Sequence, residues 1–155
     1  MGRITQVAVA IGSNLGDREA HLAFAVARLK SLLDHFRQSS LRETDAVGVG
    51  AQPRFLNGAV VGRTSLSARA LLDALLTIER ERGRERPHPG AARTLDLDLI
   101  LYGDAVIDEP GLRVPHPRFR ERLFVLEPLA EVAGDWVDPV TGRTVAELRD
   151  VLGGP

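Results

Sequence analysis

Hydrophobic positions along this chain change their spacing several times, and each change marks the boundary of a predicted element. The apolar run at residues 4–11 predicts a buried strand that ends at the glycine-bearing segment 12–16. From about residue 17 to residue 36 the apolar side chains recur at helical spacing, which predicts a helix with one buried stripe. That stripe comprises Leu22, Val26, Leu29, Leu33 and Phe36.

Two further strands and a second helix are predicted in the middle of the chain. Residues 38–45 are expected to form a strand that leads into a glycine-bearing loop at 46–51, and residues 55–64 form another strand in a well-covered sheet. Ser67 is a suitable N-cap for a helix that ends near Gly83. The proline and glycine residues of segment 84–92 predict a loop.

The last predicted strand of the sheet contains two acidic residues among leucines. In a strand, Asp96 and Asp98 share one face, while Leu95, Leu97, Leu99 and Leu101 are expected on the other. This strand completes a β-α-β-β-α-β order, which is typical of ferredoxin-like folds. We therefore predict one α+β domain over residues 1–155, a ferredoxin-like sandwich with a C-terminal extension. The extension should contain a proline-rich turn at 114–117, a helix at about 118–133 and a short amphipathic helix at 145–152.

Composition narrows the function classes. The 155 residues are 44% hydrophobic and carry a formal net charge of -1, so no general attraction to nucleic acid or to an anionic membrane is expected. Cysteine is absent, which excludes disulfides and thiolate catalysis. Lys30 is the only lysine, and it lacks the glycines of a Walker P-loop. No signal peptide or membrane span is seen, so we expect a cytoplasmic protein.

Asp96 and Asp98 are the first candidate site residues. Two ionised carboxylates repel each other and are costly to bury, so the pair makes physical sense if divalent cations offset its charge. Oxygen ligands without a histidine or cysteine beside them favour magnesium over zinc. An edge strand with one solvated face is the alternative, and it is the commoner explanation for an isolated pair of this kind.

Arginine residues near this strand point to a phosphate ligand. Arg93 lies three residues before Asp96, and Arg84 lies in a basic run upstream. A magnesium-phosphate ligand uses carboxylates to hold the metal and guanidinium groups to neutralise the remaining oxygens. Glutamates interleave with the arginines of segment 80–86, so an exposed helix end of mixed charge explains most of that run. We single out Arg84 and Arg93.

Five motifs occur here in one order and at separations that match a known family. They are Gly12-Ser13-Asn14-Leu15-Gly16, Phe55-Leu56-Asn57, Glu79 followed by Gly83-Arg84, Arg93-Thr94-Leu95-Asp96-Leu97-Asp98, and Val114-Pro115-His116. From residue 7 to about residue 129, the chain resembles the 6-hydroxymethyl-7,8-dihydropterin pyrophosphokinases of folate biosynthesis. The resemblance implies a ferredoxin-like fold and transfer of an intact pyrophosphoryl group from ATP to the pterin hydroxymethyl oxygen. The products would be AMP and the pterin diphosphate.

The resemblance also implies roles on the ATP side. Asp96 and Asp98 would hold two magnesium ions that bridge the ATP phosphates and the acceptor oxygen. Arg84 and Arg93 would stabilise the phosphates as charge redistributes during transfer. The remaining ATP-side positions are His116 and Arg122, which would face phosphate, and Glu79 and Leu99, which would lie on the nucleotide side.

On the pterin side, the resemblance implies that Phe55 and Phe124 sandwich the flat ring. Asn57 and the backbone from Thr44 to Val47 would supply hydrogen bonds to its amide-like edge. Core packing alone would explain either phenylalanine about as well as stacking does. Asn57 is harder to explain that way, because asparagine is unfavourable in strands and needs buried partners.

Several alternatives stay open at this point. His116 could be a turn residue without chemistry, and segment 12–16 is in part simply a strand-to-helix turn. An RNA-binding module, a magnesium-dependent nuclease and a non-catalytic pterin or nucleotide binder share parts of the pattern. Asp96 and Asp98 would repel an RNA backbone unless metal intervened, and the balanced charge and few aromatic residues disfavour a nuclease. We expect a monomer whose partners are small molecules.

The chain departs from the family pattern at several positions. Asp45-Ala46-Val47-Gly48 replaces a proline-containing segment, Phe55 replaces a tyrosine, and segment 86–92 lacks a tryptophan. Because segment 84–92 has little apolar surface to bury, we expect it to become ordered over the site only with all ligands bound.

Overall fold

The computed structural model describes residues 3–44, 54–82 and 94–153 of the chain. Its strands are β1 (Thr5–Ser13), β2 (Asp34–Gln38), β3 (Arg42–Thr44), β4 (Phe55–Thr64), β5 (Asp96–Tyr102), β6 (Ile107–Glu109) and β7 (Leu112–Val114). Its helices are α1 (Arg18–Leu32), α2 (Ala68–Glu81), the 3-10 helix η1 (Phe119–Glu121), α3 (Leu123–Ala133) and α4 (Val145–Gly153). None of these helices in the described ranges is long and apolar enough to cross a membrane.

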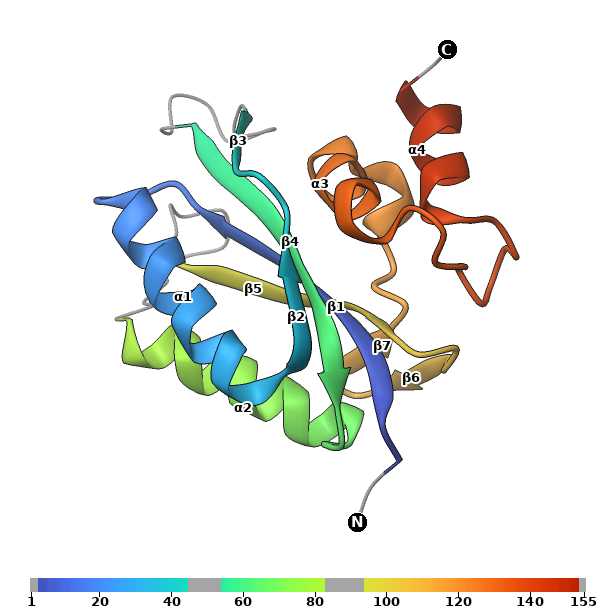
Figure 1. The fold of residues 1–155 in the computed structure, drawn as a ribbon, viewed down its shortest axis with the longest axis horizontal. Helices are drawn as coiled ribbons and strands as arrows, with labels where there is room; N and C mark the ends of the chain where they lie inside the picture. The colour runs from blue at the N-terminus through green and yellow to red at the C-terminus, as the bar shows by residue number, and fades with distance from the viewer. Residues whose placement is uncertain (1–2, 45–53, 83–93, 154–155) are drawn as a thin grey trace.

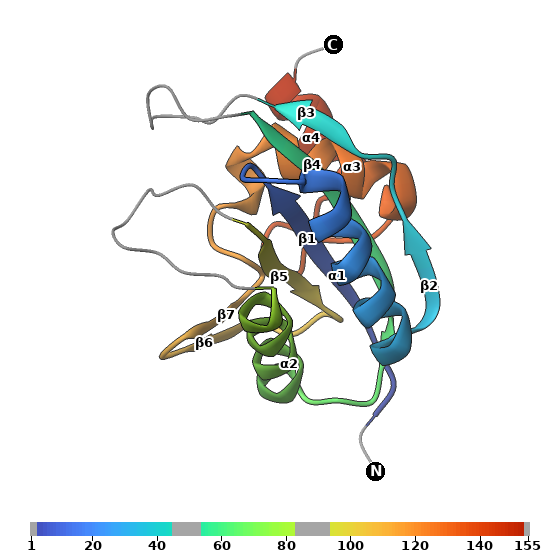
Figure 2. The same ribbon diagram turned by 90° about the vertical axis from the view of Figure 1, so that its left-hand side faces the viewer.

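The main sheet lies between two layers of helices (Figures 1 and 2). Its strand order is β2-β4-β1-β5, with β3 paired to β4, and its pairs are antiparallel. Helices α1 and α2 cover one face, and α3 with α4 covers the other. The predicted β-α-β-β-α-β order and ferredoxin-like class are therefore confirmed, and the C-terminal extension supplies the second helical layer.

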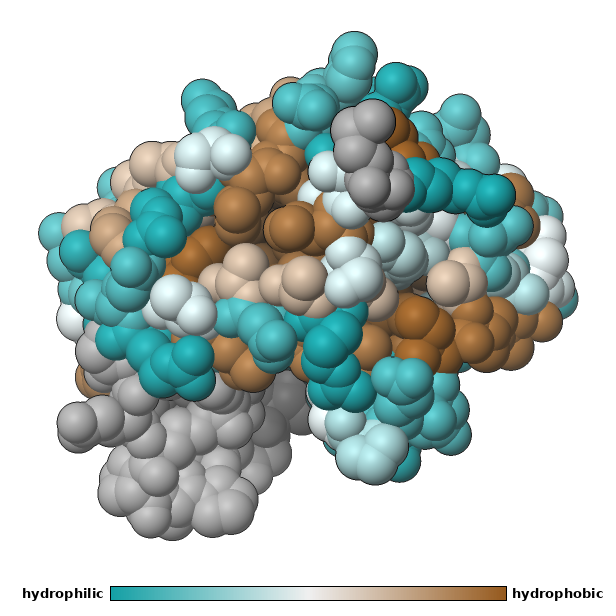
Figure 3. Space-filling view, turned by 90° about the horizontal axis from the view of Figure 1, so that it is seen from below, coloured by the Kyte–Doolittle hydropathy of each residue, from teal (hydrophilic) through white to brown (hydrophobic). Residues whose placement is uncertain are grey.

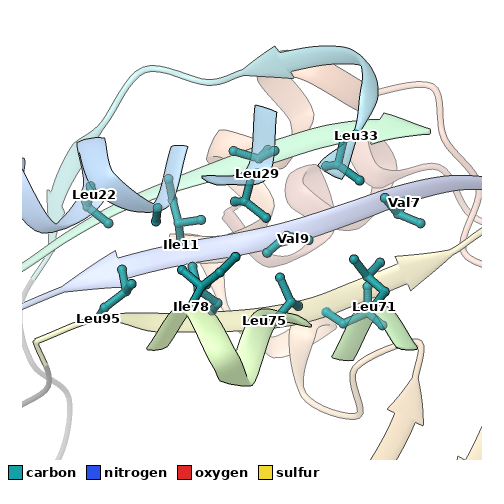
Figure 4. Close-up of a cluster of buried hydrophobic side chains, with 14 of the residues drawn as sticks. Val7, Val9, Ile11, Leu22, Leu29, Leu33, Leu71, Leu75, Ile78 and Leu95 are labelled. Carbon is teal, nitrogen blue, oxygen red and sulfur yellow. The ribbon is translucent and has the colours of Figure 1, made fainter. Parts of the chain in front are cut away.

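Strand β1 divides the core into two clusters by simple alternation. Val7, Val9 and Ile11 point toward α1 and α2, where they meet the leucines of both helices (Figure 4). Ala8 points to the opposite face and packs in a second cluster under α3 and α4. Each fully buried leucine, isoleucine or valine stabilises the fold by roughly 1.5–3 kcal/mol. The face toward α3 is lined by smaller residues, and this difference shapes the site.

The two helices of the first layer begin at side-chain caps. Asp17 accepts a hydrogen bond from the backbone N–H of Ala20, and Ser67 accepts one from that of Ala70, each at 3.1 Å. Ser67 is the predicted N-cap, so the start of α2 is confirmed. The helix ends at Glu81, which agrees with the predicted end near Gly83.

Helix α1 is shorter than the predicted 17–36, because the chain becomes extended at Leu33. Phe36 therefore lies in strand β2. Both side chains still pack against the cluster under α1 and α2. Their apolar spacing thus continues across the turn, and the pattern alone could not locate the end of the helix.

The strand predicted at 38–45 is also wrong in its bounds, because β2 ends at Gln38 and β3 begins only at Arg42. Ser39 lies in the gap and pairs with Ala59 in an unusual way. Its N–H donates to the Ala59 carbonyl and its Oγ accepts from the Ala59 N–H, each at 2.9 Å. A side-chain hydroxyl thus replaces a backbone carbonyl, and the regular ladder is interrupted.

The C-terminal extension contains two further departures. The helix predicted at about 118–133 is divided into η1 and α3, because Arg122 has an extended backbone between them. Strands β6 and β7 form an unpredicted hairpin, with Gly111 at a φ of 77° in its turn. Helix α4 confirms the last predicted amphipathic segment.

Leu101 lies on the face opposite to the one predicted. The pairing of β1 with β5 shifts between Ala8 and Val9, so that one residue of β5, Ile100, is extra. Before the shift, Leu95, Leu97 and Leu99 belong to the cluster under α1 and α2. After it, Leu101 packs in the cluster under α3 and α4. A bulge of this kind reverses strand alternation and leaves no clear trace in the sequence.

Candidate active site

The sheet face toward α3 has small residues at its centre and polar residues on both sides of them. Directly paired residues of antiparallel strands point to the same face, so the register defines rows across the sheet. One row joins Asn57 of β4, Gly12 of β1 and Asp96 of β5. The next row places Ala10 beside Asp98. Between the amide and the two carboxylates, the floor of the site therefore carries little side-chain bulk.

The two carboxylates lie together as the alternation predicts. Leu95, Leu97 and Leu99 enter the core under α1 and α2, so Asp96 and Asp98 project from the opposite face, where both are half-buried. No group of three or more histidine, aspartate or glutamate side chains suited to a metal is found among residues 3–44, 54–82 and 94–153. A half-buried pair of carboxylates fits magnesium, which commonly takes one or two carboxylates and completes its shell with water and phosphate oxygens.

Glu79 holds the backbone of this acidic strand from its outer edge. Its carboxylate is buried at 2% exposure, and its Oε2 accepts a hydrogen bond of 2.8 Å from the N–H of Leu97. Leu97 lies between the two aspartates, on a strand that has only β1 beside it in the sheet. The structure thus gives Glu79 a role in fixing the backbone that carries both carboxylates. Contact with a nucleotide remains a prediction.

Asn57 lies across Gly12 and is held there by Thr44. Its Nδ2 donates a hydrogen bond of 2.5 Å to Thr44 Oγ1, and its side chain is 7% exposed. A Cβ atom added at Gly12 would lie 2.7 Å from Asn57 Oδ1, closer than real Cβ contacts allow. Glycine is thus required at this position by a close approach. Because β1 extends to Ser13, the motif at 12–16 is partly strand and not only a turn.

His116 and Arg122 flank the turn that leads into α3. The backbone N–H of His116 donates to the Ile100 carbonyl at 2.9 Å, which ties the turn to β5. The ring Nδ1 accepts from the Arg118 N–H at 3.1 Å, so a neutral ring carries its proton on Nε2. Burial and the nearby Arg122 guanidinium lower the pKa of His116, against an opposing effect of Asp96. A neutral hydrogen-bond donor thus lies in the same electrostatic environment as Arg122 and Asp96.

The two candidate ring-stacking residues are on the same side of the sheet. Phe55 lies two residues before Asn57 on β4, so both side chains share the face toward α3, and Phe124 comes from the first turn of α3. Each is half-buried. Phe124 packs against the core under α3 and α4, and the Arg122 guanidinium lies 5.5 Å from its ring centre. Phe55 belongs to neither core cluster, so core packing accounts for it less well than for Phe124.

Leu99 differs from the other candidates because its side chain is buried, at 5% exposure, in the core under α1 and α2. Any contact with a nucleotide would have to come from its backbone. Arg84, Arg93 and Val47 lie outside the described residues, as does segment 84–92. Their expected roles therefore stay predictions.

Arg42 is a nearby residue that sequence reasoning missed. It pairs with Asn57 in the sheet register, and its guanidinium binds Glu127 and Glu131 of α3, each at 3.2 Å. Glu131 also accepts from the N–H and Oγ of Ser40. These contacts attach α3 to the strand that carries Thr44. No local pattern could reveal them, because the partners lie far apart in the sequence.

A separate hollow occurs at the opposite end of β1 and β5. It is lined by residues 3–6, by residues 101–105 and by Trp136 with its neighbours, and it includes none of the candidate site residues. Figure 3 shows the underside of the molecule, where apolar residues gather in the middle and polar residues surround them. The hollow is thus separate from the candidate active site, which lies where β1 ends and β5 begins.

Comparison with known proteins gives a consistent family. The family model described as 7,8-dihydro-6-hydroxymethylpterin-pyrophosphokinase matches residues 8–134. A 2-amino-4-hydroxy-6-hydroxymethyldihydropteridine pyrophosphokinase of Synechocystis is 44% identical over 142 residues, which cover 90% of this chain and 72% of that protein. The enzyme of the same name from Bacillus subtilis is 48% identical over 126 residues, which cover 80% and 75%.

A solved structure supports the fold independently. The HPPK-DHPS protein of Plasmodium falciparum superposes on 97% of this chain with a TM-score of 0.75 and 14% sequence identity. This chain spans only 45% of that protein's length, so the likeness concerns one part of a larger protein. From the family match and the two relatives, we conclude that the chain belongs to the 7,8-dihydro-6-hydroxymethylpterin-pyrophosphokinase family.

Proposed function

We propose that this chain transfers pyrophosphate from ATP to the hydroxymethyl group of 6-hydroxymethyl-7,8-dihydropterin, as its family membership implies. The observation that carries the proposal is the row across the sheet. It places the Asn57 amide, the bare Gly12 backbone and the Asp96 carboxylate side by side, with His116 and Arg122 nearby. Such a face can receive a flat polar ring on one side and metal-bound phosphates on the other.

In the reaction, the acceptor hydroxyl oxygen attacks the β-phosphorus of ATP, and the bond from that phosphorus to the oxygen bridging to the α-phosphate breaks. AMP leaves with the bond's electron pair, and the hydroxyl proton is released. Asp96 and Asp98 would hold magnesium, which when bound would offset phosphate charge and lower the cost of bringing the acceptor oxygen close. Glu79 keeps the strand between the carboxylates in place through the Leu97 N–H.

Cationic and neutral donors would share the phosphate oxygens. Arg122 supplies a guanidinium fork, and the neutral His116 ring supplies its Nε2–H without adding charge. We assign Arg84 and Arg93 to stabilising the phosphates as negative charge moves to the leaving oxygen. Glu79 and the backbone of Leu99 are assigned to the nucleotide side.

The pterin ring would bind at the β3 and β4 side of the floor. Phe55 and Phe124 would stack on its two faces, and the amide of Asn57 with the backbone from Thr44 to Val47 would pair with its polar edge. The hydrogen bond from Asn57 to Thr44 supports this assignment, because it fixes the amide orientation before a ligand binds.

The proposal also covers the number of magnesium ions, the oligomeric state, the partners and the compartment. Two magnesium ions suit two adjacent carboxylates facing a triphosphate. We also propose that the chain acts as a single monomeric domain, because one sheet face of a single chain carries both the Asn57 amide and the two carboxylates. A net charge of -1 gives no support for nucleic acid as a partner, and dependence on ATP suits the cytoplasm.

The decisive experiment measures AMP formation by the purified chain with magnesium, ATP and the reduced hydroxymethyl pterin. AMP and pterin diphosphate should appear in equal amounts, and AMP should not form at that rate without the pterin. Asp98→Asn should remove most of the activity, whereas Asp73→Asn, which removes an exposed carboxylate on α2, should leave it intact. Binding of the pterin without any AMP would instead indicate a non-catalytic binding module.

A further inference from the structure

Asp138 is a buried charged residue outside the candidate site, and its carboxylate receives several hydrogen bonds. Its side chain is fully buried, and its two oxygens receive the Arg120 guanidinium in a bidentate pair, at 2.5 Å from Nε and 2.8 Å from Nη2. The N–H of Val140 and the hydroxyl of Thr141 also donate to it. Although burial alone would raise the pKa of Asp138, these donors hold it at about 2. The pair is therefore charged at neutral pH.

The Arg120 end of this pair lies in the turn that carries two candidate phosphate-binding side chains. Arg120 is in η1, between His116 and Arg122. Backbone hydrogen bonds link this turn continuously, from the Phe119 N–H to the His116 carbonyl and from the Arg122 N–H to the Phe119 carbonyl. Phe119 is fully buried, and the Arg120 guanidinium lies 4.9 Å from its ring centre. A change in the position of Arg120 should therefore also move His116 and Arg122 at the two ends of the turn.

The Asp138 end is anchored in a rigid connection between α3 and α4. The Asp138 N–H donates to the Arg143 carbonyl, and the Asp138 carbonyl accepts from the Gly142 N–H, each at 2.8 Å. Val137 and Thr144 form an isolated β-bridge beside it. The ion pair therefore joins the segment before α3 to the segment after it.

We infer that Asp138 is a positioning residue, which acts through Arg120 to hold His116 and Arg122 at the phosphate side of the site. The inference rests on the proposed function, because it assigns the two held side chains to ATP. A planar guanidinium held at two oxygens fixes both the position and the direction of the turn. We assign Asp138 itself no chemical step, because its side chain bonds to Arg120 and to its own turn.

The alternative is that the pair only stabilises the fold, and nucleotide binding separates the two explanations. Most of the pterin side is held independently, because Asn57 bonds to Thr44 and because Arg42 and Ser40 attach α3 to β3 through Glu127 and Glu131; only Phe124 adjoins the turn. A loosened turn should therefore weaken ATP more than pterin. General destabilisation would weaken both ligands equally, or neither at a temperature where the variant is folded.

The test uses Arg120→Met, Arg120→Lys and Asp138→Asn, with Arg69→Met as the matched control. Arg69 makes a more exposed contact with Glu109 and the Pro110 carbonyl, which involves none of the candidate site residues. Calorimetry would measure binding of a non-hydrolysable ATP analogue with magnesium, and separately binding of the pterin. Steady-state kinetics would give kcat and both KM values for each protein.

We expect Arg120→Met to lower kcat/KM for ATP by about 10- to 100-fold, the range in which a small misplacement of remote origin acts. The pterin dissociation constant should stay within about threefold of wild type, since Thr44, Phe55 and Asn57 lie on β3 and β4, and only Phe124 adjoins the turn. Arg120→Lys keeps the charge but loses the bidentate geometry, so it should be intermediate. Arg69→Met should match wild type.

Three outcomes would overturn the inference: folded Arg120 variants with wild-type ATP kinetics, equal losses for ATP and pterin, or full activity of Arg120→Lys. If Asp138→Asn or Arg120→Met does not fold, Arg120→Lys still decides the matter, because it keeps a cation beside the buried Asp138 carboxylate. Absence of AMP formation by the wild-type chain would instead contradict the proposed function. The two failures are therefore distinguishable.

Discussion

Gly12→Ala should damage the site through a single added methyl group. The new Cβ would lie 2.7 Å from Asn57 Oδ1, so the amide must move. Asn57 is 7% exposed and bonded to Thr44, so moving it breaks a hydrogen bond worth about 0.5–1.5 kcal/mol. Overpacking costs roughly 1–3 kcal/mol, and the lower entropy of the unfolded chain returns about 0.4–1 kcal/mol. We expect a net loss of roughly 1–3 kcal/mol.

For a domain of this size, that loss corresponds to a fall in Tm of about 3–10 °C. Differential scanning calorimetry would measure it, and fluorescence titration would show weaker pterin binding. In an Asn57→Ala background the same substitution should cost much less, because the clash has been removed. Gly153→Ala is the control, since its Cβ would meet only the Leu123 side chain, at 3.4 Å from Cδ2 and 3.9 Å from Cδ1. Unchanged Tm and pterin affinity in Gly12→Ala would refute the assigned contact.

Further expectations concern the charged groups. Asp96→Asn and Asp98→Asn should each lower turnover on the order of 100-fold at saturating magnesium, with Tm level or higher because a like-charge pair is relieved. Near-normal turnover in both variants would remove the metal assignment. Arg93→Ala should lower kcat more than it raises the KM for ATP, whereas a raised KM with unchanged kcat would make it a binding residue. Glu79→Ala should lose about 1–3 kcal/mol in urea unfolding, because a buried N–H loses its acceptor, while Glu79→Gln retains an acceptor oxygen and should lose much less. Equal losses would contradict the bracing role. For Asp138, the pKa falls from 3.8 to about 2 on folding, so its contribution of about 2 kcal/mol is present above pH 4 and disappears as the pH falls through 2. The free energy of unfolding should change less between pH 5 and pH 2.5 in Asp138→Asn than in wild type, and equal changes in the two proteins would contradict this.

Most of the fold was predictable because the strands and helices have distinct periods. Strand β4 and helix α2 start where the patterns indicate, since a continuous apolar run and a capped helical repeat are both local signals. The end of α1 was not predictable, because Leu33 and Phe36 serve the same core after the chain has left the helix. The break at Arg122 has a similar origin, as its extended backbone interrupts an apolar pattern that continues into α3.

The candidate site divides in the same way. Asp96 and Asp98 follow from alternation within one strand, and Asn57 attracts attention as an amide inside an apolar run. The close approach of Asn57 to Gly12 depends on the register between two strands, and the contact from Glu79 to Leu97 depends on how α2 packs at the sheet edge. Neither can be obtained from spacing along the chain, because each is fixed by the tertiary structure.

The acidic strand shows how the fold meets the cost of its own site. Repulsion between two half-buried carboxylates on one face favours separation of the strand from its neighbours, particularly at the edge of a sheet. Three sets of contacts hold β5 in place. It pairs with β1, its Leu97 N–H donates to Glu79, and its Ile100 carbonyl accepts from the His116 N–H. Two of these contacts come from candidate nucleotide-side residues. The contacts that position Glu79 and His116 are therefore the same contacts that hold the acidic strand in the sheet. A variant that loosens either contact should loosen both the strand and the candidate residue.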